Sequence, residues 1–218
     1  MLSHNRRERT IAIGLAGLAG YVDALGFMTL GGYFIAFMSG NTTRLGVGGV
    51  RDIATALLPA AIIALFVVGV MLGTLIHHAI GRRQRVAVMA LVTLLLLSAA
   101  LAAEADGRWP AVLCMALAMG AVNTVFQRNG EVSLGVTYMT GALVKLGQRL
   151  TGVVLGGNRL AWVWYFLLWL ALLAGTMAGS AAYLMFGLQG LWLAVAAALV
   201  ICGLLWHWPA MPQRRPMS

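Results

Sequence analysis

The stretch from residue 53 to residue 80, IATALLPAAIIALFVVGVMLGTLIHHAI, decides the class of fold because it contains no Asp, Glu, Lys or Arg. A helix needs about 20 apolar residues to cross the roughly 30 Å hydrocarbon core of a bilayer, so this stretch predicts a membrane-spanning helix. The whole chain agrees with this, since 61% of its 218 residues are hydrophobic and only 10% are charged. Soluble domains carry about 25% charged residues. The composition therefore excludes a disordered chain, a disulfide scaffold and an ordinary soluble enzyme.

Five further segments have the length and hydropathy of membrane spans. The six predicted spans cover about residues 10–31, 53–80, 86–104, 109–128, 160–185 and 189–208. Two shorter stretches, 33–50 and 131–150, contain Ser, Thr and Asn and are less apolar. We expect them to be interrupted or re-entrant half-helices, which gives an all-α integral membrane protein with six transmembrane helices. In the alternative, both short stretches cross the membrane and the chain has eight spans.

Basic residues orient the chain. The net charge is +9, from 15 Lys and Arg against 6 Asp and Glu, which in a soluble protein would suggest nucleic-acid binding. In a membrane protein such residues mark the cytoplasmic ends of spans, so we expect no nucleic-acid partner. The six-span arrangement puts the clusters Arg6–Arg9 and Arg82–Arg85 on the cytoplasmic side, together with both termini, whereas the eight-span arrangement exposes the second cluster outside.

The sequence repeats itself at a spacing of about 100 residues. The matched positions are Gly20 and Asp23 with Gly120 and Asn123, Met38-Ser39-Gly40 with Met139-Thr140-Gly141, and Gly69 and Gly73 with Gly175 and Gly179. We therefore predict one membrane domain, 1–218, made of repeat 1 (1–105) and repeat 2 (106–218). Three spans per repeat make the repeats inverted, as in many secondary transporters, while eight spans make them parallel. The glycines predict close helix crossings.

Asp23 is an acidic residue deep in a predicted span, one turn from Gly20. An intramembrane carboxylate is costly and functional by default, so we expect a proton- or cation-coupling group. The alternative is a structural hydrogen bond or an ion pair, with Arg128 as its partner. The equivalent residue in repeat 2, Asn123, retains the shape without the charge, which favours a single protonation or cation site.

The start of each half-helix is polar. We expect Ser39 or Asn41 to cap the first half-helix, and two half-helix N-termini that converge would form a cradle for an anion or carboxylate. In the alternative, these segments only fill the bundle. The predicted substrate-binding residues are Ser39, Gly40, Asn41, Thr42, Thr137, Tyr138, Thr140 and Gly141.

The polar sequence Gln127-Arg128-Asn129-Gly130-Glu131 interrupts the apolar pattern before the second half-helix. Arg128 and Glu131 could pair if this turn is helical, and Gln127, Arg128 and Glu131 are candidate gate or coupling residues. The alternative is a solvated loop. The sequence contains no metal-ligand cluster, nucleophile triad, P-loop or dinucleotide fingerprint. We therefore predict no metal, no cofactor and no enzymatic activity.

Three strings of residues carry a resemblance to a known family. They are GYVDALGF at 20–27, FMSGNTTRLG at 37–46 and TYMTG at 137–141. Through them the chain resembles the YoaK-like family of bacterial inner-membrane proteins, which belong to a domain of unknown function. The resemblance covers essentially the whole chain and implies six spans in the bacterial inner membrane. It implies no activity and no catalytic residues.

These observations favour a small secondary transporter or permease in the bilayer. Its unidentified small solute, for which an anion fits the cradle, would bind at the interface between the repeats near the midplane. The alternatives are a small-ion channel and a non-transporting scaffold or assembly protein. A chain of this size is compatible with a homodimer, although no motif specifies one.

Overall fold

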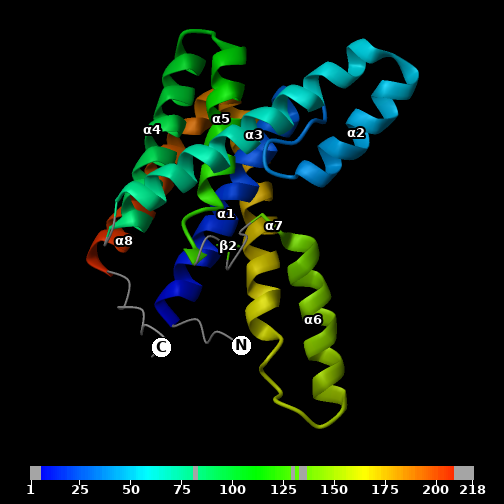
Figure 1. Ribbon diagram of the computed structural model, residues 1–218, viewed down its shortest axis with the longest axis vertical. Coiled ribbons are helices and arrows are strands. Elements are labelled where there is room, and N and C mark those ends of the chain that lie inside the picture. Colours follow the sequence, from blue (N-terminus) through cyan, green and yellow to red (C-terminus); the bar gives the residue numbers. More distant parts are fainter. Residues whose placement is uncertain (1–5, 81–82, 129–130, 133–136, 209–218) are drawn as a thin grey trace.

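The computed structural model describes residues 6–80, 83–128, 131–132 and 137–208, which form eight α-helices, a short 3-10 helix and one pair of two-residue strands (Figure 1). The predicted all-helical class is confirmed, apart from this small hairpin. The elements are α1 (Arg6–Thr29), α2 (Met38–Arg51), α3 (Ile53–Ala79), α4 (Gln84–Glu104), α5 (Arg108–Val122), β1 (Gln127–Arg128), β2 (Glu131–Val132), α6 (Met139–Val154), α7 (Val163–Phe186), η1 (Gly187–Gly190) and α8 (Leu191–His207).

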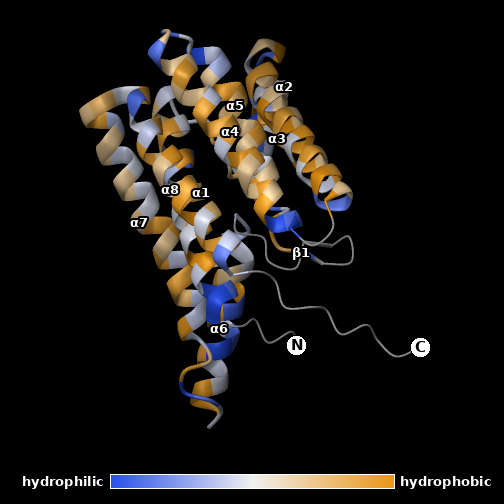
Figure 2. Cartoon of the chain, turned by 90° about the vertical axis from the view of Figure 1, so that its left-hand side faces the viewer, coloured by the Kyte–Doolittle hydropathy of each residue, from blue (hydrophilic) through white to orange (hydrophobic). Residues whose placement is uncertain are grey.

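Within the part of the chain that the structure describes, four helical stretches are long and apolar enough to cross a membrane. They are Arg6–Thr29, Ile53–Ala79, Gln84–Glu104 and Val163–His207, of which the last contains α7, η1 and α8. Helix α5, Arg108–Val122, is a shorter apolar helix. Figure 2 shows apolar residues along most of the helical surface, with hydrophilic residues near the ends of the helices. The chain is therefore a multi-pass membrane protein.

Arginine and tryptophan side chains form a belt at one end of the molecule, which we call the basic end. The guanidinium groups of Arg7, Arg9 and Arg83 lie 5.7, 5.4 and 3.8 Å from the ring centres of their partners. Those partners are Trp208, Trp164 and Trp206, respectively. The starts of α1 and α4 therefore lie beside the end of α8, and the start of α7 lies beside the start of α1. Tryptophan and basic residues are typical of a membrane–water interface.

Two hydrogen bonds define the opposite end. Arg108 donates a hydrogen bond to the carbonyl of Thr29, and Trp192 Nε1 donates to Glu104 Oε1 at 2.9 Å. These bonds join the end of α1 to the start of α5, and the end of α4 to the start of α8. Helices α1 and α5 thus start at opposite ends of the molecule.

Two helix pairs cross at glycines, α1 on α7 and α5 on α3. A methyl group on Gly20 would collide with the carbonyl of Leu172, and one on Gly120 would collide with the carbonyl of Phe66. Gly175 faces the carbonyl of Gly17 in the same way, and Gly69 faces that of Leu117. The sequence offsets of 100 and 106 relate these contacts to one another. The predicted close crossings are confirmed. The first helix of each half packs on the third helix of the other half, α1 on α7 and α5 on α3.

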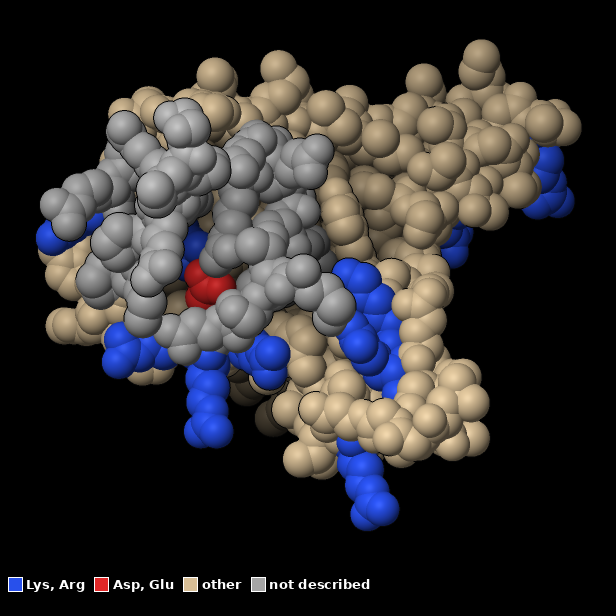
Figure 3. All heavy atoms as spheres, turned by 60° about the horizontal axis from the view of Figure 1, so that its bottom comes forward, with Lys and Arg blue, Asp and Glu red and all other residues tan. Residues whose placement is uncertain are grey.

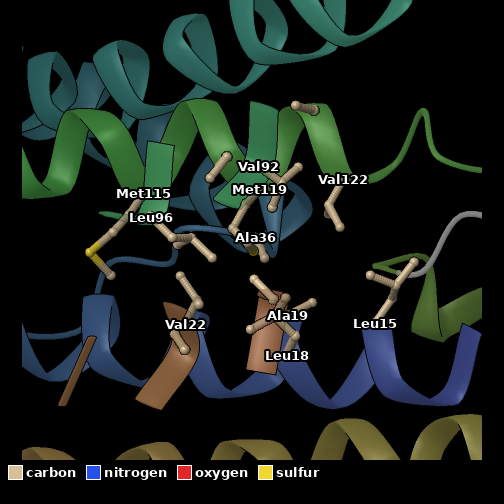
Figure 4. Close-up of a cluster of buried hydrophobic side chains, with 14 of the residues drawn as sticks. Leu15, Leu18, Ala19, Val22, Ala36, Val92, Leu96, Met115, Met119 and Val122 are labelled. Carbon is tan, nitrogen blue, oxygen red and sulfur yellow. The ribbon is translucent and has the colours of Figure 1, made fainter. Parts of the chain in front are cut away.

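The core lies where α1 and α5 meet. Figure 4 shows Leu18 and Val22 of α1 facing Met119 of α5, with Val92 of α4 nearby. Ala36, from the segment between α1 and α2, also enters this cluster and is 6% exposed. The non-helical segment between α1 and α2 is therefore part of the protein interior.

Candidate functional site

The segment from residue 30 to residue 37, which we call linker 1, joins α1 to α2 inside the protein. The backbone N–H groups of Ile35 and Ala36 donate to Asp23 Oδ1 at 2.6 and 2.7 Å. Neither N–H has a helical partner, and a buried backbone donor without an acceptor is costly. The carboxylate of Asp23, which is partly exposed, therefore holds linker 1 on α1.

Asn123 makes the equivalent contact in the second half. Its Oδ1 accepts hydrogen bonds from Thr137 Oγ1 at 3.0 Å and from the Thr137 backbone N–H at 3.4 Å. Its Nδ2 donates to the carbonyl of Met119 at 2.9 Å. Thr137 matches Ala36 at an offset of 101. We call the 123–138 connection linker 2, and each linker is held by an oxygen of the residue at position 23 or 123.

Asn41 holds linker 1 a second time. This side chain is fully buried, its Nδ2 donates to the carbonyl of Phe34 at 2.7 Å, and its Oδ1 accepts the Phe34 N–H at 3.0 Å. The predicted capping role was wrong, because the residue before α2 is Phe37, which makes no side-chain cap, and Ser39 and Asn41 lie inside the helix. The equivalent of Asn41 in repeat 2 is Ala142, whose side chain cannot make the same hydrogen bonds.

The other predicted binding residues lie at the starts of α2 and α6. Ser39, Thr42, Tyr138, Thr140 and Gly141 are exposed, and Gly40 is partly exposed. The hydroxyl of Thr42 donates back to the carbonyl of Met38 at 2.9 Å. Helix α2 leads away along α3, and α6 leads away along α7 (Figure 1). Within the described residues, α2 and α6 form no extensive packing contact, so the two starts do not close a cradle by direct packing.

The segment at 127–131, for which a helical turn and a solvated loop were both left open, contains a pair of short strands. Strands β1 and β2 are antiparallel, with Gln127 opposite Val132 and Arg128 opposite Glu131. Arg128 and Glu131 are therefore opposite residues on two paired strands. The three-residue spacing that would bring them together in a helix does not apply to them. Their side chains, and hence the proposed Asp23–Arg128 pair, lie outside the described residues. Gln127 is 5% exposed.

One polar contact at the basic end was missed by the sequence analysis. Arg85 of α4 forms an ion pair with Glu8 of α1 at 3.0 Å, and both side chains are largely buried. The same guanidinium lies 5.3 Å from the ring centre of Phe126. This ion pair joins the start of α1, the start of α4 and the turn after α5. Nothing in the sequence links two residues 77 positions apart.

A cavity opens at the end opposite to the basic end. It has a volume of about 450 Å³ and is lined by Thr29, Asp106, Arg108, Tyr183 and Gln189, among others. Asp23 lies six residues before Thr29 on α1, which corresponds to about 9 Å along the helix axis. The cavity therefore lies beside the end of α1, and none of residues 30–37 lines it.

Comparisons with known proteins agree with the membrane assignment. A family model described as a protein of unknown function, DUF1275, matches residues 11–204. The chain is 32% identical over 215 residues to the UPF0700 transmembrane protein RA0705 of Rhizobium meliloti (strain 1021), which covers 96% of this chain and 93% of the relative. No solved structure matches the chain. YoaK-like proteins are members of the same family, so the predicted resemblance is confirmed. The chain belongs to the DUF1275 family of transmembrane proteins of unknown function.

Proposed function

We propose that this protein is a small permease of the bacterial inner membrane that couples movement of an anionic solute to protonation of Asp23. The observation that carries the proposal is the difference between the two linkers. A titratable carboxylate accepts two backbone N–H groups from linker 1. Linker 2 is held instead by the side-chain amide of Asn123, which does not titrate.

The helix directions support six spans in two inverted repeats. Helices α1, α4 and α7 start at the basic end, where α8 stops, while α5 starts at the opposite end. Each of α1 and α5 is then followed by a linker and a half-helix, which in this proposal enters and leaves the membrane on one side. Equivalent helices α1 and α5 run in opposite directions, as inverted repeats require. Basic residues face the cytoplasm, so both termini are cytoplasmic in this proposal.

Protonation of Asp23 gives the coupling step. A hydrogen bond to an ionised acceptor is roughly twice as strong as one between neutral groups. When the carboxylate takes up a proton, its bonds to Ile35 and Ala36 weaken and linker 1 becomes freer to move with α2. Asn123 gives no such response, so linker 2 stays held. Proton binding therefore acts on one half of the molecule only.

The starts of the half-helices supply the solute site in this proposal. Neither Phe37 before α2 nor Tyr138 before α6 provides a side-chain cap, so backbone N–H groups of each first turn are available to a ligand. The helix dipole adds partial positive charge there, which favours an anion. The exposed hydroxyls of Ser39 and Thr140 offer further hydrogen bonds. A small carboxylate or inorganic anion fits this chemistry.

The proposal is tested with purified protein in liposomes that carry an inward proton gradient and a panel of small carboxylates and inorganic anions. We expect solute uptake to accelerate with the proton gradient. A radiolabel on the solute measures uptake, and a pH-sensitive dye inside the vesicle measures proton entry. Asp23→Asn retains an oxygen for the linker, as Asn123 does, so flux should persist but lose its dependence on the gradient. Asp52→Asn is the matched control, because Asp52 is an exposed helix cap.

Two outcomes contradict the proposal. Flux that ignores the proton gradient in the wild type, together with single-channel conductance, would indicate an ion channel. Absence of flux for every solute, with Asp23 inaccessible to water, would indicate a scaffold. A gradient response that survives in Asp23→Asn would remove Asp23 as the coupling group.

A further inference from the structure

A crevice at the basic end contains three arginines. It lies between the start of α1 and the hairpin formed by α6 and α7, and its volume is about 770 Å³. Arg6 and Arg9 come from α1 and Arg149 from α6, with Asn158 beside them. None of the described residues that line this basic crevice is acidic. Figure 3, which views this end of the molecule, shows Lys and Arg side chains gathered over it.

Most of the remaining lining of the basic crevice is apolar. It includes Ile13 of α1 and Val163 and Leu167 of α7, and Leu167 is 39% exposed. The indole of Trp164 also lines the crevice, with the guanidinium of Arg9 lying 5.4 Å from its ring centre. A ligand with a negative head and an apolar tail matches this lining, because its two parts would meet the arginines and the wall of α7.

The internal repeat shows that packing does not require these arginines. At an offset of 100, Arg6 corresponds to Asp106 and Arg9 to Trp109, and at an offset of 101 Arg149 corresponds to Gly48. The second copy of the same helix arrangement, at the opposite end, therefore forms without any of the three charges. The three positive charges therefore distinguish the basic end from the equivalent place at the opposite end.

We propose that the basic crevice binds the phosphate-bearing headgroup of an anionic phospholipid. The guanidinium group offers several donors in a planar fork that matches phosphate oxygens. Basic pockets between membrane helices on the cytoplasmic side bind such headgroups, and each arginine near an anionic membrane surface strengthens binding about fivefold, the factor that corresponds to about 1 kcal/mol. The Arg and Trp belt puts the crevice at the depth of lipid headgroups, and the exposed face of α7 continues from it toward the acyl chains.

The test measures bound lipid by native mass spectrometry of the full chain in detergent, with phosphatidylglycerol or phosphatidylcholine added. We expect a specific phosphatidylglycerol adduct on the wild type and about 25-fold weaker binding in Arg6→Gln with Arg149→Gln, two arginines at about fivefold each. Arg44→Gln with Arg51→Gln removes the same charge from the α2–α3 hairpin and should stay within about twofold of wild type. Arg6→Gln with Arg9→Gln repeats the test without altering α6.

Competition with inorganic phosphate distinguishes a site for a phospholipid headgroup from a site for free phosphate. If the phosphate headgroup must arrive with its acyl chains, millimolar phosphate will not displace the lipid. Displacement by phosphate at that concentration would overturn the proposal in favour of a free-anion site. Equal loss in the Arg44 and Arg51 control would overturn it too, since the effect would then follow net charge. Equal binding of phosphatidylcholine would remove the role of the arginines.

Discussion

The two linkers are held by equivalent residues of different charge, and this is the main difference between the two halves. Asp23 accepts two backbone N–H groups, while Asn123 accepts the hydroxyl and the N–H of Thr137. Both residues supply one oxygen to the segment that enters a half-helix. The geometry therefore requires an acceptor at this position, and the negative charge is an addition in the first half.

The helix crossings, in contrast, are the same in both halves. Gly20 meets the Leu172 carbonyl as Gly120 meets the Phe66 carbonyl. Linker 1 has a further contact, from Asn41, and the equivalent residue in the second half is Ala142, which has no polar side chain. The described contacts thus combine a repeated scaffold with linkers that are held by residues of different charge, which is where a functional difference between the halves would arise.

The largest expected effect comes from the shared crossings. We expect Gly20→Ala and Gly120→Ala each to cost about 4–5 kcal/mol in the free energy of unfolding, the upper range for single substitutions, because the added methyl meets backbone that cannot rotate away. Gly46→Ala and Gly147→Ala are matched controls, since the space around both is open, and alanine favours helix there. The loss of stability is measured by thermal unfolding in detergent, with the thiol labelling of Cys114 and Cys202 as the signal of unfolding. A large loss in only one crossing would contradict their equivalence.

The second effect compares the linkers directly. Asp23→Ala should cost about 3 kcal/mol and Asn123→Ala about 1–2 kcal/mol, because hydrogen bonds to an ionised group contribute more than those between neutral groups. Both variants leave buried donors without an acceptor. Unfolding in mixed detergent and SDS micelles near neutral pH compares the two. If Asn123→Ala is the more damaging, then charge is not what strengthens linker 1.

Much of this arrangement could be predicted from the repeat. The offsets of 100 and 106 pair Gly20 with Gly120 and Gly69 with Gly175 in the sequence, and the structure gives these pairs matching contacts. Asp23 and Asn123 also occupy equivalent places. A repeat is visible in sequence because each half must satisfy the same packing constraints, and glycine is required wherever two backbones approach closely.

The partners of the polar groups could not be predicted. Ser39 or Asn41 was expected to cap the first half-helix, but Asn41 lies inside α2 and binds the backbone of Phe34, because linker 1 folds back over the first turn of the helix. In the 127–131 segment, where a helical turn and a solvated loop were both left open, Arg128 pairs with Glu131 across two short antiparallel strands. Both outcomes depend on the path of a non-helical segment through the core, and hydrophobic periodicity carries no information about such a path.

The smallest expected effect lies where α7 turns into α8. The hydroxyl of Tyr21 donates to the carbonyl of Gly190 at 2.8 Å, and the equivalent residue in repeat 2 is Ala121, which has no hydroxyl. Tyr21→Phe removes this bond and should cost about 1 kcal/mol, seen as a small fall in the temperature of unfolding. Tyr138→Phe, with an exposed side chain, should cause no fall. A loss as large as that of Asp23→Ala would extend the asymmetry between the halves from the linkers to the α7–α8 corner.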